Sequence, residues 1–187
     1  MKPLPFPYSV NIGTDIVHLS RILRLISRPH NYGKVTYLQR FKRRILCDQE
    51  RQDFRARFPP PPSTPLTTGP RPWDAPITTE MARWLAGRFA AKEAARKAGH
   101  GGGASSISWK DVQVRTEGSG NAGRPEVVYL NANGERRIGK LSISHDGDYI
   151  IAMVLTAGWC PKIFILAGHY FPGNPKSCPH WLEEMLV

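Results

Sequence analysis

The sequence predicts an α+β fold in which one long helix packs on a small antiparallel β-sheet. Residues 79–98 are rich in Ala, Lys, Glu and Arg, which are strong helix formers. Three stretches of β-forming residues follow, separated by turns rich in glycine and proline, a pattern typical of hairpins. A length of 187 residues suits one domain, which we expect to span 1–187.

The first predicted strand covers residues 8–17, where side chains alternate between two faces. One face carries Val10, Ile12, Thr14 and Ile16, and the other carries Asn11, Gly13, Asp15 and Val17. Gly13 would allow a ligand or another backbone to approach closely. Asp15 points away from the apolar row, and taken alone it is best interpreted as the N-cap of the next helix.

Three shorter helices are predicted next, over residues 19–28, 36–46 and about 48–58, with Asp48 as the expected cap of the third. Composition then changes sharply, because residues 59–76 contain eight of the 17 prolines. We interpret 59–76 as an exposed polyproline-like insertion within the domain.

The long helix has recognisable ends, since Thr78 can cap its start and Gly99 can end it. On a helical wheel one narrow face holds mostly small side chains: Trp84, Gly87, Ala91, Ala94, Ala95 and Ala98. A neighbouring element could therefore approach this face closely.

The charged rows of this helix allow two interpretations. Arg88, Lys92 and Arg96 form one row, and Glu93 and Lys97 form the next, spaced as an i, i+4 ion pair. Spacing alone is equally compatible with a solvated face. One carboxylate among four cations nevertheless suits a metal-bridged phosphate better than simple solubility.

Three strand signals are predicted in the second half, over 109–115, over 126–130, and over 140–144 continuing after a turn into 149–155. A C-terminal extension, 157–187, follows them. His145 ends the 140–144 strand, and a histidine in such a position is usually structural when considered alone.

Charge and cysteine content limit the class of protein. The excess of 26 Lys and Arg over 15 Asp and Glu gives a net charge of +11, which favours an anionic partner without choosing among nucleic acid, membrane surface and acidic protein. The three cysteines, Cys47, Cys160 and Cys178, have no C-x-x-C spacing, which argues against a disulfide framework and a zinc ribbon. No apolar run of about 18 residues exists, so we expect no membrane span.

Four motifs in order resemble holo-acyl-carrier-protein synthase, a 4'-phosphopantetheinyl transferase. They are Gly13-Thr14-Asp15-Ile16, Arg88-Phe89-Ala90-Ala91-Lys92-Glu93-Ala94 with Lys97, Gly123-Arg124-Pro125, and Ser142-Ile143-Ser144-His145. Phe41, Arg44 and Glu50 fit a further family pattern in which Cys47 replaces Ser or Thr. The resemblance covers about residues 10–155.

The resemblance implies an enzyme of fatty acid biosynthesis that moves the phosphopantetheine arm of coenzyme A onto a serine of an apo acyl carrier protein, leaving 3',5'-ADP. It implies that Asp15 and Glu93 hold Mg²⁺ and that Lys97 neutralises phosphate charge. Glu93 is the expected acceptor of the serine proton. The residues expected to contact coenzyme A are Arg88, Lys92, Ser144, His145, Gly123 and Pro125.

The resemblance also implies partners. Acyl carrier proteins are generally acidic, so a positive surface would steer them to the site. Arg21 aligns with a family arginine that contacts the carrier, and Arg24 lies on the same predicted helix. Family members of this short class are commonly homotrimers with active sites between subunits. His18 stands where the family usually has Glu. We expect a mitochondrial location, otherwise a cytoplasmic one.

Two other functions remain open from the sequence: a basic nucleic-acid-binding protein without catalytic activity, and an inactive scaffold that only holds carrier protein. Binding that requires coenzyme A and Mg²⁺ would favour the enzyme, whereas strongly salt-dependent binding to any RNA or DNA would favour the nucleic-acid reading. We expect neither nucleic acid nor membrane as a partner.

Overall fold

The computed structural model describes residues 10–28, 35–59, 76–99, 107–117, 123–130 and 136–157. These residues contain a five-stranded antiparallel sheet with the order β1-β5-β4-β3-β2. Its strands are β1 (Val10–His18), β2 (Val112–Thr116), β3 (Pro125–Leu130), β4 (Arg136–Asp146) and β5 (Tyr149–Ala157). The helices are α1 (Leu19–Ile26), α2 (Tyr37–Ile45), α3 (Asp48–Arg57) and α4 (Thr79–Ala98), with a short 3-10 helix, η1 (Trp109–Asp111). The predicted α+β class is confirmed.

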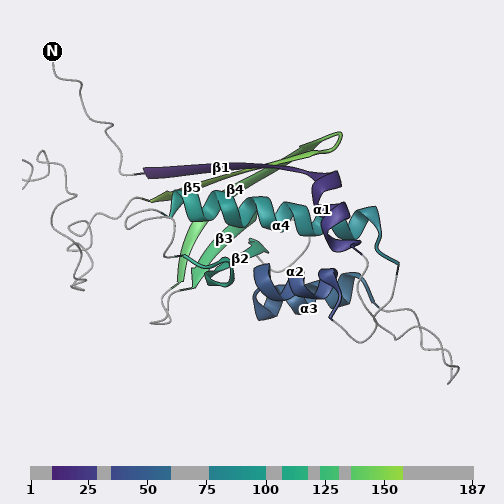
Figure 1. Cartoon of the computed structure of the whole chain (residues 1–187). Helices are drawn as coiled ribbons and strands as arrows, with labels where there is room; N and C mark the ends of the chain where they lie inside the picture. Colours follow the sequence, from purple (N-terminus) through teal and green to yellow (C-terminus); the bar gives the residue numbers. More distant parts are fainter. Residues whose placement is uncertain are drawn as a thin grey trace, which may run out of the picture.

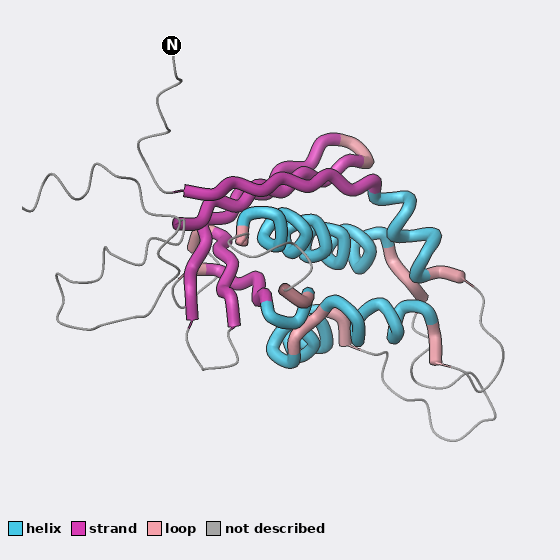
Figure 2. Tube along the Cα trace, turned by 60° about the vertical axis from the view of Figure 1, so that its left-hand side comes forward, coloured by secondary structure: helices cyan, strands magenta, loops and turns pink. Residues whose placement is uncertain are grey.

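Helix α4 is the centre of the molecule (Figure 1). One side of it lies against the sheet, chiefly β1 and β5, and α2 and α3 lie on its opposite side, as the rotated view also shows (Figure 2). The hydrophobic core follows this arrangement, because buried side chains of α4 meet those of α1, α3 and the strands. The side chains of α4 therefore face either the sheet or helices α2 and α3.

The predicted bounds and caps of the long helix are confirmed. The Thr78 side chain accepts a hydrogen bond from the Met81 N–H at 3.1 Å, and the Gly99 N–H donates to the Ala95 carbonyl at 2.8 Å. Four alanines of the small face, Ala91, Ala94, Ala95 and Ala98, are fully buried.

Gly13 makes the close contact between β1 and α4 possible. A Cβ at Gly13 would collide with the Ala94 carbonyl oxygen and lie 2.6 Å from the Ala98 nitrogen. Because both are backbone atoms, the helix could not move them aside without separating from the strand. The sequence predicted a close neighbour for Gly13 and, separately, one for the small face of the helix. The structure shows that these two elements are each other's neighbour.

Three local predictions are wrong. Asp15 is not the N-cap of α1, because β1 continues past it and His18 holds that position. Asp48 is not the cap of α3 either: Cys47 is the N-cap, and its N–H donates to Glu50 Oε2 at 3.0 Å. Trp109 lies in η1 and not in a strand, since Ser108 and Asp111 cap that turn.

The apolar row of β1 faces away from α4. Ile12 and Ile16 are 62% and 58% exposed, and the register places them beside Leu155 and Ile151 of β5, which are also exposed. The helix covers the other face of β1 because Gly13 is on that face. The described part of the sheet therefore presents an open apolar surface.

No helix among the described residues combines the length and the apolar character that crossing a bilayer requires. Cys47 is a buried free thiol, as predicted for it. Cys160, Cys178, residues 60–75 of the predicted insertion and residues 158–187 of the predicted extension lie outside the described residues.

Candidate functional site

Asp15 and Lys97 meet where α4 crosses β1. Lys97 Nζ lies 2.8 Å from Asp15 Oδ1 and also donates to the Thr14 carbonyl at 2.7 Å. The Lys97 side chain is 50% exposed and that of Asp15 is 18% exposed, so the pair is open to solvent on one side. The predicted i, i+4 pair between Lys97 and Glu93 is wrong, because Lys97 reaches across to the strand instead.

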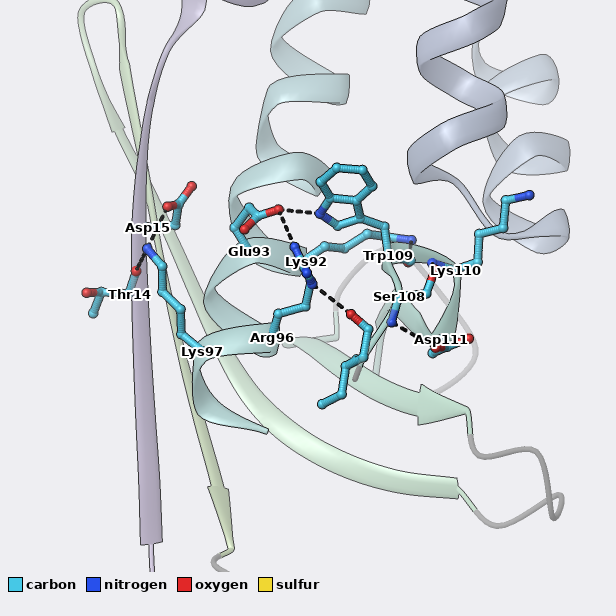
Figure 3. A network of polar contacts seen from close by, with 11 residues as sticks. Thr14, Asp15, Lys92, Glu93, Arg96, Lys97, Ser108, Trp109, Lys110 and Asp111 are labelled. Carbon is cyan, nitrogen blue, oxygen red and sulfur yellow. Dashed lines mark hydrogen bonds and ion pairs between the residues drawn. The ribbon is translucent and has the colours of Figure 1, made fainter. Parts of the chain in front are cut away.

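Glu93 sits one turn before Lys97 on α4, and its carboxylate is held from the other side. Arg96 Nη1 donates to Glu93 Oε1 at 3.0 Å, and the indole N–H of Trp109 donates to the same oxygen. In Figure 3 Asp15 and Lys97 meet beside β1, and the Glu93 carboxylate lies on the neighbouring turn of the helix. The structure thus gathers Asp15, Glu93 and Lys97 at one crossing.

Lys92 belongs to the core and not to this crossing. Its side chain and that of Glu50 are both 0% exposed, and the two groups form an ion pair of 2.5 Å. Lys92 Nζ also donates to the carbonyls of Ile45 at 2.7 Å and Trp109 at 2.8 Å. An ammonium has three N–H donors, so none is left for a phosphate. The structure therefore contradicts the predicted contact between Lys92 and coenzyme A.

The electrostatics of Lys92 agree with a structural role. Burial lowers the pKa of its ammonium, and the Glu50 carboxylate beside it opposes that shift. Glu50 also accepts from the N–H groups of Cys47 and Val114, which joins α3 to β2. Lys92 thus connects α4 to α3 through Glu50, and to η1, which precedes the edge strand β2, through the Trp109 carbonyl.

Arg88 lies on the side of α4 that faces α3. Its guanidinium stacks 3.3 Å from the centroid of the Trp84 ring, and its Nε is buried without a hydrogen-bond partner among the described residues. Burial lowers the pKa of Arg88 to about 10, against the opposing charges of Glu50 and Asp53.

The remaining predicted contacts lie elsewhere on the chain. Ser144 and His145 are exposed near the end of β4, and Gly123 and Pro125 are exposed at the start of β3. Two strands, β5 and β4, separate β3 from β1, which is about 14 Å at the usual strand spacing. Within one chain this spacing keeps Gly123 and Pro125 away from the Asp15–Glu93–Lys97 crossing, whereas only β5 lies between β1 and the strand of Ser144 and His145.

Arg21 and Arg24 are exposed on α1, the helix that directly follows β1. They are accessible to a partner, as docking requires. The His18 side chain makes no capping hydrogen bond to α1. Its Nδ1 lies 2.8 Å from Ser20 Oγ, and its ring packs edge-on against Tyr149.

Sequence reasoning missed Trp109 as a residue of the site. No local pattern marks its indole as a partner of Glu93, because 16 positions separate the two residues. Glu50 was recognised only as part of a family pattern, and its burial against Lys92 could not be read from spacing.

Within the described ranges, no three His, Cys, Asp or Glu side chains gather into a group that could hold a metal ion. Asp15 and Glu93 are two carboxylates on adjacent elements. Any metal there would need further oxygen ligands from outside the protein.

The comparisons with known proteins identify the family of the chain. A family model described as the 4'-phosphopantetheinyl transferase superfamily matches residues 11–154. The chain is 60% identical over 165 residues to "4'-phosphopantetheinyl transferase B, mitochondrial" of Aspergillus fumigatus, which covers 84% of this chain and 100% of the relative. It is 33% identical to a holo-[acyl-carrier-protein] synthase of Shouchella clausii, over 78% of this chain and 96% of the relative.

Solved structures support the same fold. A holo-(acyl-carrier-protein) synthase from Bacillus anthracis in complex with CoA (3',5'-ADP) aligns with a TM-score of 0.52 and 28% identity, covering 80% of this chain and 96% of that one. The holo-ACP-synthase from Plasmodium yoelii aligns with a TM-score of 0.53 at 21% identity, which concerns the fold alone. The predicted family and enzyme class are confirmed, and the chain belongs to the 4'-phosphopantetheinyl transferase superfamily.

Proposed function

We propose that this protein transfers the 4'-phosphopantetheine arm of coenzyme A to a serine of an apo acyl carrier protein and releases 3',5'-ADP. The observation that carries the proposal is the contact of Asp15 with Lys97 at the crossing of α4 and β1, with the Glu93 carboxylate on the neighbouring turn of the helix. The names of the relatives support both substrates, since they include holo-acyl-carrier-protein synthases and a complex with coenzyme A. They favour this function over nucleic-acid binding.

The side chains at the crossing suit phosphoryl transfer, which depends on positioning and on neutralising charge more than on covalent help from the protein. Glu93 would accept the proton of the carrier serine as its oxygen attacks the β-phosphorus, and the bond to 3',5'-ADP would break. Lys97 stabilises the charge that develops on the departing phosphate. In the substrate-free chain, Asp15 keeps the Lys97 ammonium at the site.

Mg²⁺ fits the donor set of this site. Asp15 and Glu93 offer the hard carboxylate oxygens that Mg²⁺ prefers, and water and pyrophosphate oxygens complete its octahedron in proteins with one or two such ligands. When bound, Mg²⁺ would supply positive charge to the pyrophosphate. Asp15 would have to exchange its contact with Lys97 for the metal, which the partial exposure of that pair permits.

The direct test is to incubate the protein with coenzyme A, Mg²⁺ and an apo carrier and to look by mass spectrometry for added phosphopantetheine. Glu93→Gln is expected to abolish transfer while the circular dichroism spectrum stays unchanged. Glu80→Gln is the matched control, because Glu80 lies on the same helix and pairs at 3.0 Å only with the exposed Arg57 among the described residues. No added mass on any carrier with the unaltered protein would defeat the proposal.

Arg21 and Arg24 are the proposed docking residues for the acidic carrier. Charge reversal by Arg21→Glu should raise KM for the carrier at least about 10-fold and change KM for coenzyme A much less, because only the carrier contact is lost. Arg83→Glu on α4 is the control, since Arg83 is exposed and the substitution changes net charge equally. Equal effects of the two substitutions would exclude specific docking at Arg21.

We also propose that the protein is a homotrimer assembled through the open apolar face of the sheet. This face carries Val10, Ile12, Ile16, Ile138, Ile151, Met153 and Leu155, each 41% exposed or more. Apolar surface of this kind is rare on monomeric proteins and marks association sites. A second copy would also supply the Gly123 and Pro125 positions that one chain keeps away from Glu93.

Light scattering on the purified protein tests this assembly. A trimeric mass is expected, and Ile151→Lys should reduce it, because a lysine in the centre of the apolar face would have to be buried. Gln52→Lys on α3 adds the same charge at an exposed position and should leave the mass unchanged. A monomeric mass for the unaltered chain would contradict the proposal.

A mitochondrial location is proposed on the name of the Aspergillus fumigatus relative together with the sequence-based expectation. Imaging of a C-terminally tagged chain against a mitochondrial marker tests it. A single domain over residues 1–187, with the insertion and the extension belonging to it, likewise stays a proposal.

A further inference from the structure

We propose that Trp109 is a positioning residue of the active site, whose indole N–H fixes the carboxylate of Glu93 in its working orientation. This inference rests on the proposed function, because it gives Glu93 the role described above. Trp109 lies in η1, outside the motifs that mark the family, and its side chain reaches Glu93 from the face of α4 opposite to β1.

The first observation is that two donors converge on one oxygen. The Trp109 indole N–H and Arg96 Nη1 both donate to Glu93 Oε1, while Oε2 receives no hydrogen bond from the residues that the structure describes. A carboxylate bound in this way cannot rotate freely, because turning it would break a charge-assisted hydrogen bond. One oxygen is thus used for anchoring, and the described residues leave the other without a hydrogen bond.

The second observation is that the backbone of Trp109 is itself anchored to α4. Its carbonyl accepts from the buried Lys92 ammonium at 2.8 Å. Arg96 Nε donates to the Ile107 carbonyl at 2.7 Å, two residues earlier. Lys92, Glu93 and Arg96 therefore tie residues 107–109 to one stretch of the helix (Figure 3).

These anchors give the buried ion pair a purpose. Lys92 is kept in place by Glu50, and both side chains are fully buried. Lys92 therefore acts on the site at a distance: it holds the carbonyl of Trp109, and Trp109 holds Glu93. Lys92 has no donor left for a phosphate, but in this proposal it still supports the reaction by holding Trp109 against Glu93.

The third observation is that packing fixes the plane of the indole. The ring centroid of Trp109 lies 6.0 Å from that of Phe89, and the guanidinium carbons of Arg44 and Arg96 lie 4.8 Å and 5.2 Å from it. A phenylalanine at position 109 would keep much of this packing but would have no N–H to donate. Trp109→Phe thus separates the hydrogen bond from the packing.

Steady-state kinetics test the proposal with the transfer assay described above. Trp109→Phe is expected to lower kcat about 10-fold or more, because a hydrogen bond to a charged group is lost, with KM for coenzyme A and for the carrier within about 2-fold. Tyr129→Phe is the matched control. The Tyr129 hydroxyl donates to the Ala95 carbonyl at 2.7 Å, so its loss removes a buried bond to the same helix without touching the carboxylate.

A second measurement does not depend on activity. The chain has five tryptophans, and the indole N–H signal of Trp109 is the one absent from the NMR spectrum of Trp109→Phe. In the full-length protein this signal is expected to move in Glu93→Gln, because the charged acceptor becomes a neutral one, and to stay in place in Glu80→Gln. Through-space contacts between this indole and the Phe89 ring assign the same signal in the unaltered protein, so the measurement stays informative if Trp109→Phe folds poorly.

The outcomes separate the two proposals. Normal kcat in Trp109→Phe with an active unaltered protein overturns the positioning role and leaves the proposed function intact. An indole signal that does not respond to Glu93→Gln overturns it as well, and so does an equal loss of kcat in Tyr129→Phe. If the unaltered protein transfers nothing to any carrier, the proposed function fails and the positioning role fails with it.

Discussion

Helix α4 carries two lysine–carboxylate pairs five residues apart, and they have opposite surroundings. Lys97 and Asp15 lie 2.8 Å apart with side chains 50% and 18% exposed, whereas Lys92 and Glu50 lie 2.5 Å apart with both side chains at 0%. The first pair is open and joins the helix to β1. The second is sealed between the helix, α3 and η1.

This difference separates a pair that can be exchanged from one that cannot. Breaking the exposed pair costs little, because water replaces each partner. Breaking the buried pair leaves a charge in the core, which is strongly unfavourable. Under the proposed function, Lys97 would leave Asp15 for a substrate phosphate, whereas Lys92 is fixed in the core.

The largest expected effect is on the buried side. Lys92→Met should reduce the free energy of unfolding by about 3–5 kcal/mol, because Glu50 would keep a buried charge without its cation. Urea or guanidinium denaturation followed by circular dichroism measures this. A loss of unfolding free energy below about 1 kcal/mol would contradict the expectation that the buried ion pair is part of the scaffold.

The matching change on the open side should affect catalysis and not stability. Lys97→Met is expected to lower kcat about 100-fold, because charge on the departing phosphate loses its stabilising cation. Its free energy of unfolding should change by at most about 1 kcal/mol, since the Lys97 side chain is 50% exposed. Equal losses of stability in Lys92→Met and Lys97→Met would show that burial does not explain the difference between the two ion pairs.

A smaller effect is expected at the contact that brings Asp15 to the helix. Gly13→Ala should cost about 1–3 kcal/mol in stability, because the new methyl group meets backbone atoms of Ala94 and Ala98. Transfer activity should fall together with stability, since β1 would be pushed away from Lys97. Thermal unfolding and the transfer assay on the same samples measure both. Unchanged melting would mean that the strand and the helix are less tightly packed.

The smallest effect should have the opposite sign. A Cβ at Gly87, also on α4, meets no atom within 4 Å, so Gly87→Ala removes a flexible residue from a helix without a clash. We expect a gain of about 0.5–1 kcal/mol in the free energy of unfolding and normal activity. A loss of stability at this position would show that α4 has a closer neighbour there than the described residues provide.

Much of the fold could be predicted because its signals are local. The bounds of α4 follow from helix propensity and from the caps at Thr78 and Gly99, which involve only neighbours in sequence. The turns rich in glycine and proline likewise predicted an antiparallel sheet from neighbouring residues alone. The error at Asp15 arose because its partner, Lys97, is distant in sequence. Those at Asp48 and Trp109 arose because a neighbouring residue, Cys47 or Ser108, caps the turn instead.

The site was predicted less completely. The resemblance to the family named Asp15, Glu93 and Lys97, and these three do come together. It could not show that Lys92 points into the core, because the next residue along a helix faces about 100° away and its surroundings depend on what packs there. Residues of β3 stay apart from the crossing in one chain, and their place in the site depends on the proposed assembly.

The sequence by itself determined the helices, the strand pattern, the family and the small face on which α4 meets β1. Only the tertiary structure decided which of Lys92 and Lys97 is buried and which is exposed. The partner of Lys92 lies 42 residues away and that of Lys97 lies 82 residues away, so no local pattern distinguishes them. Burial sets the cost of breaking an ion pair, and burial exists only once the chain has folded.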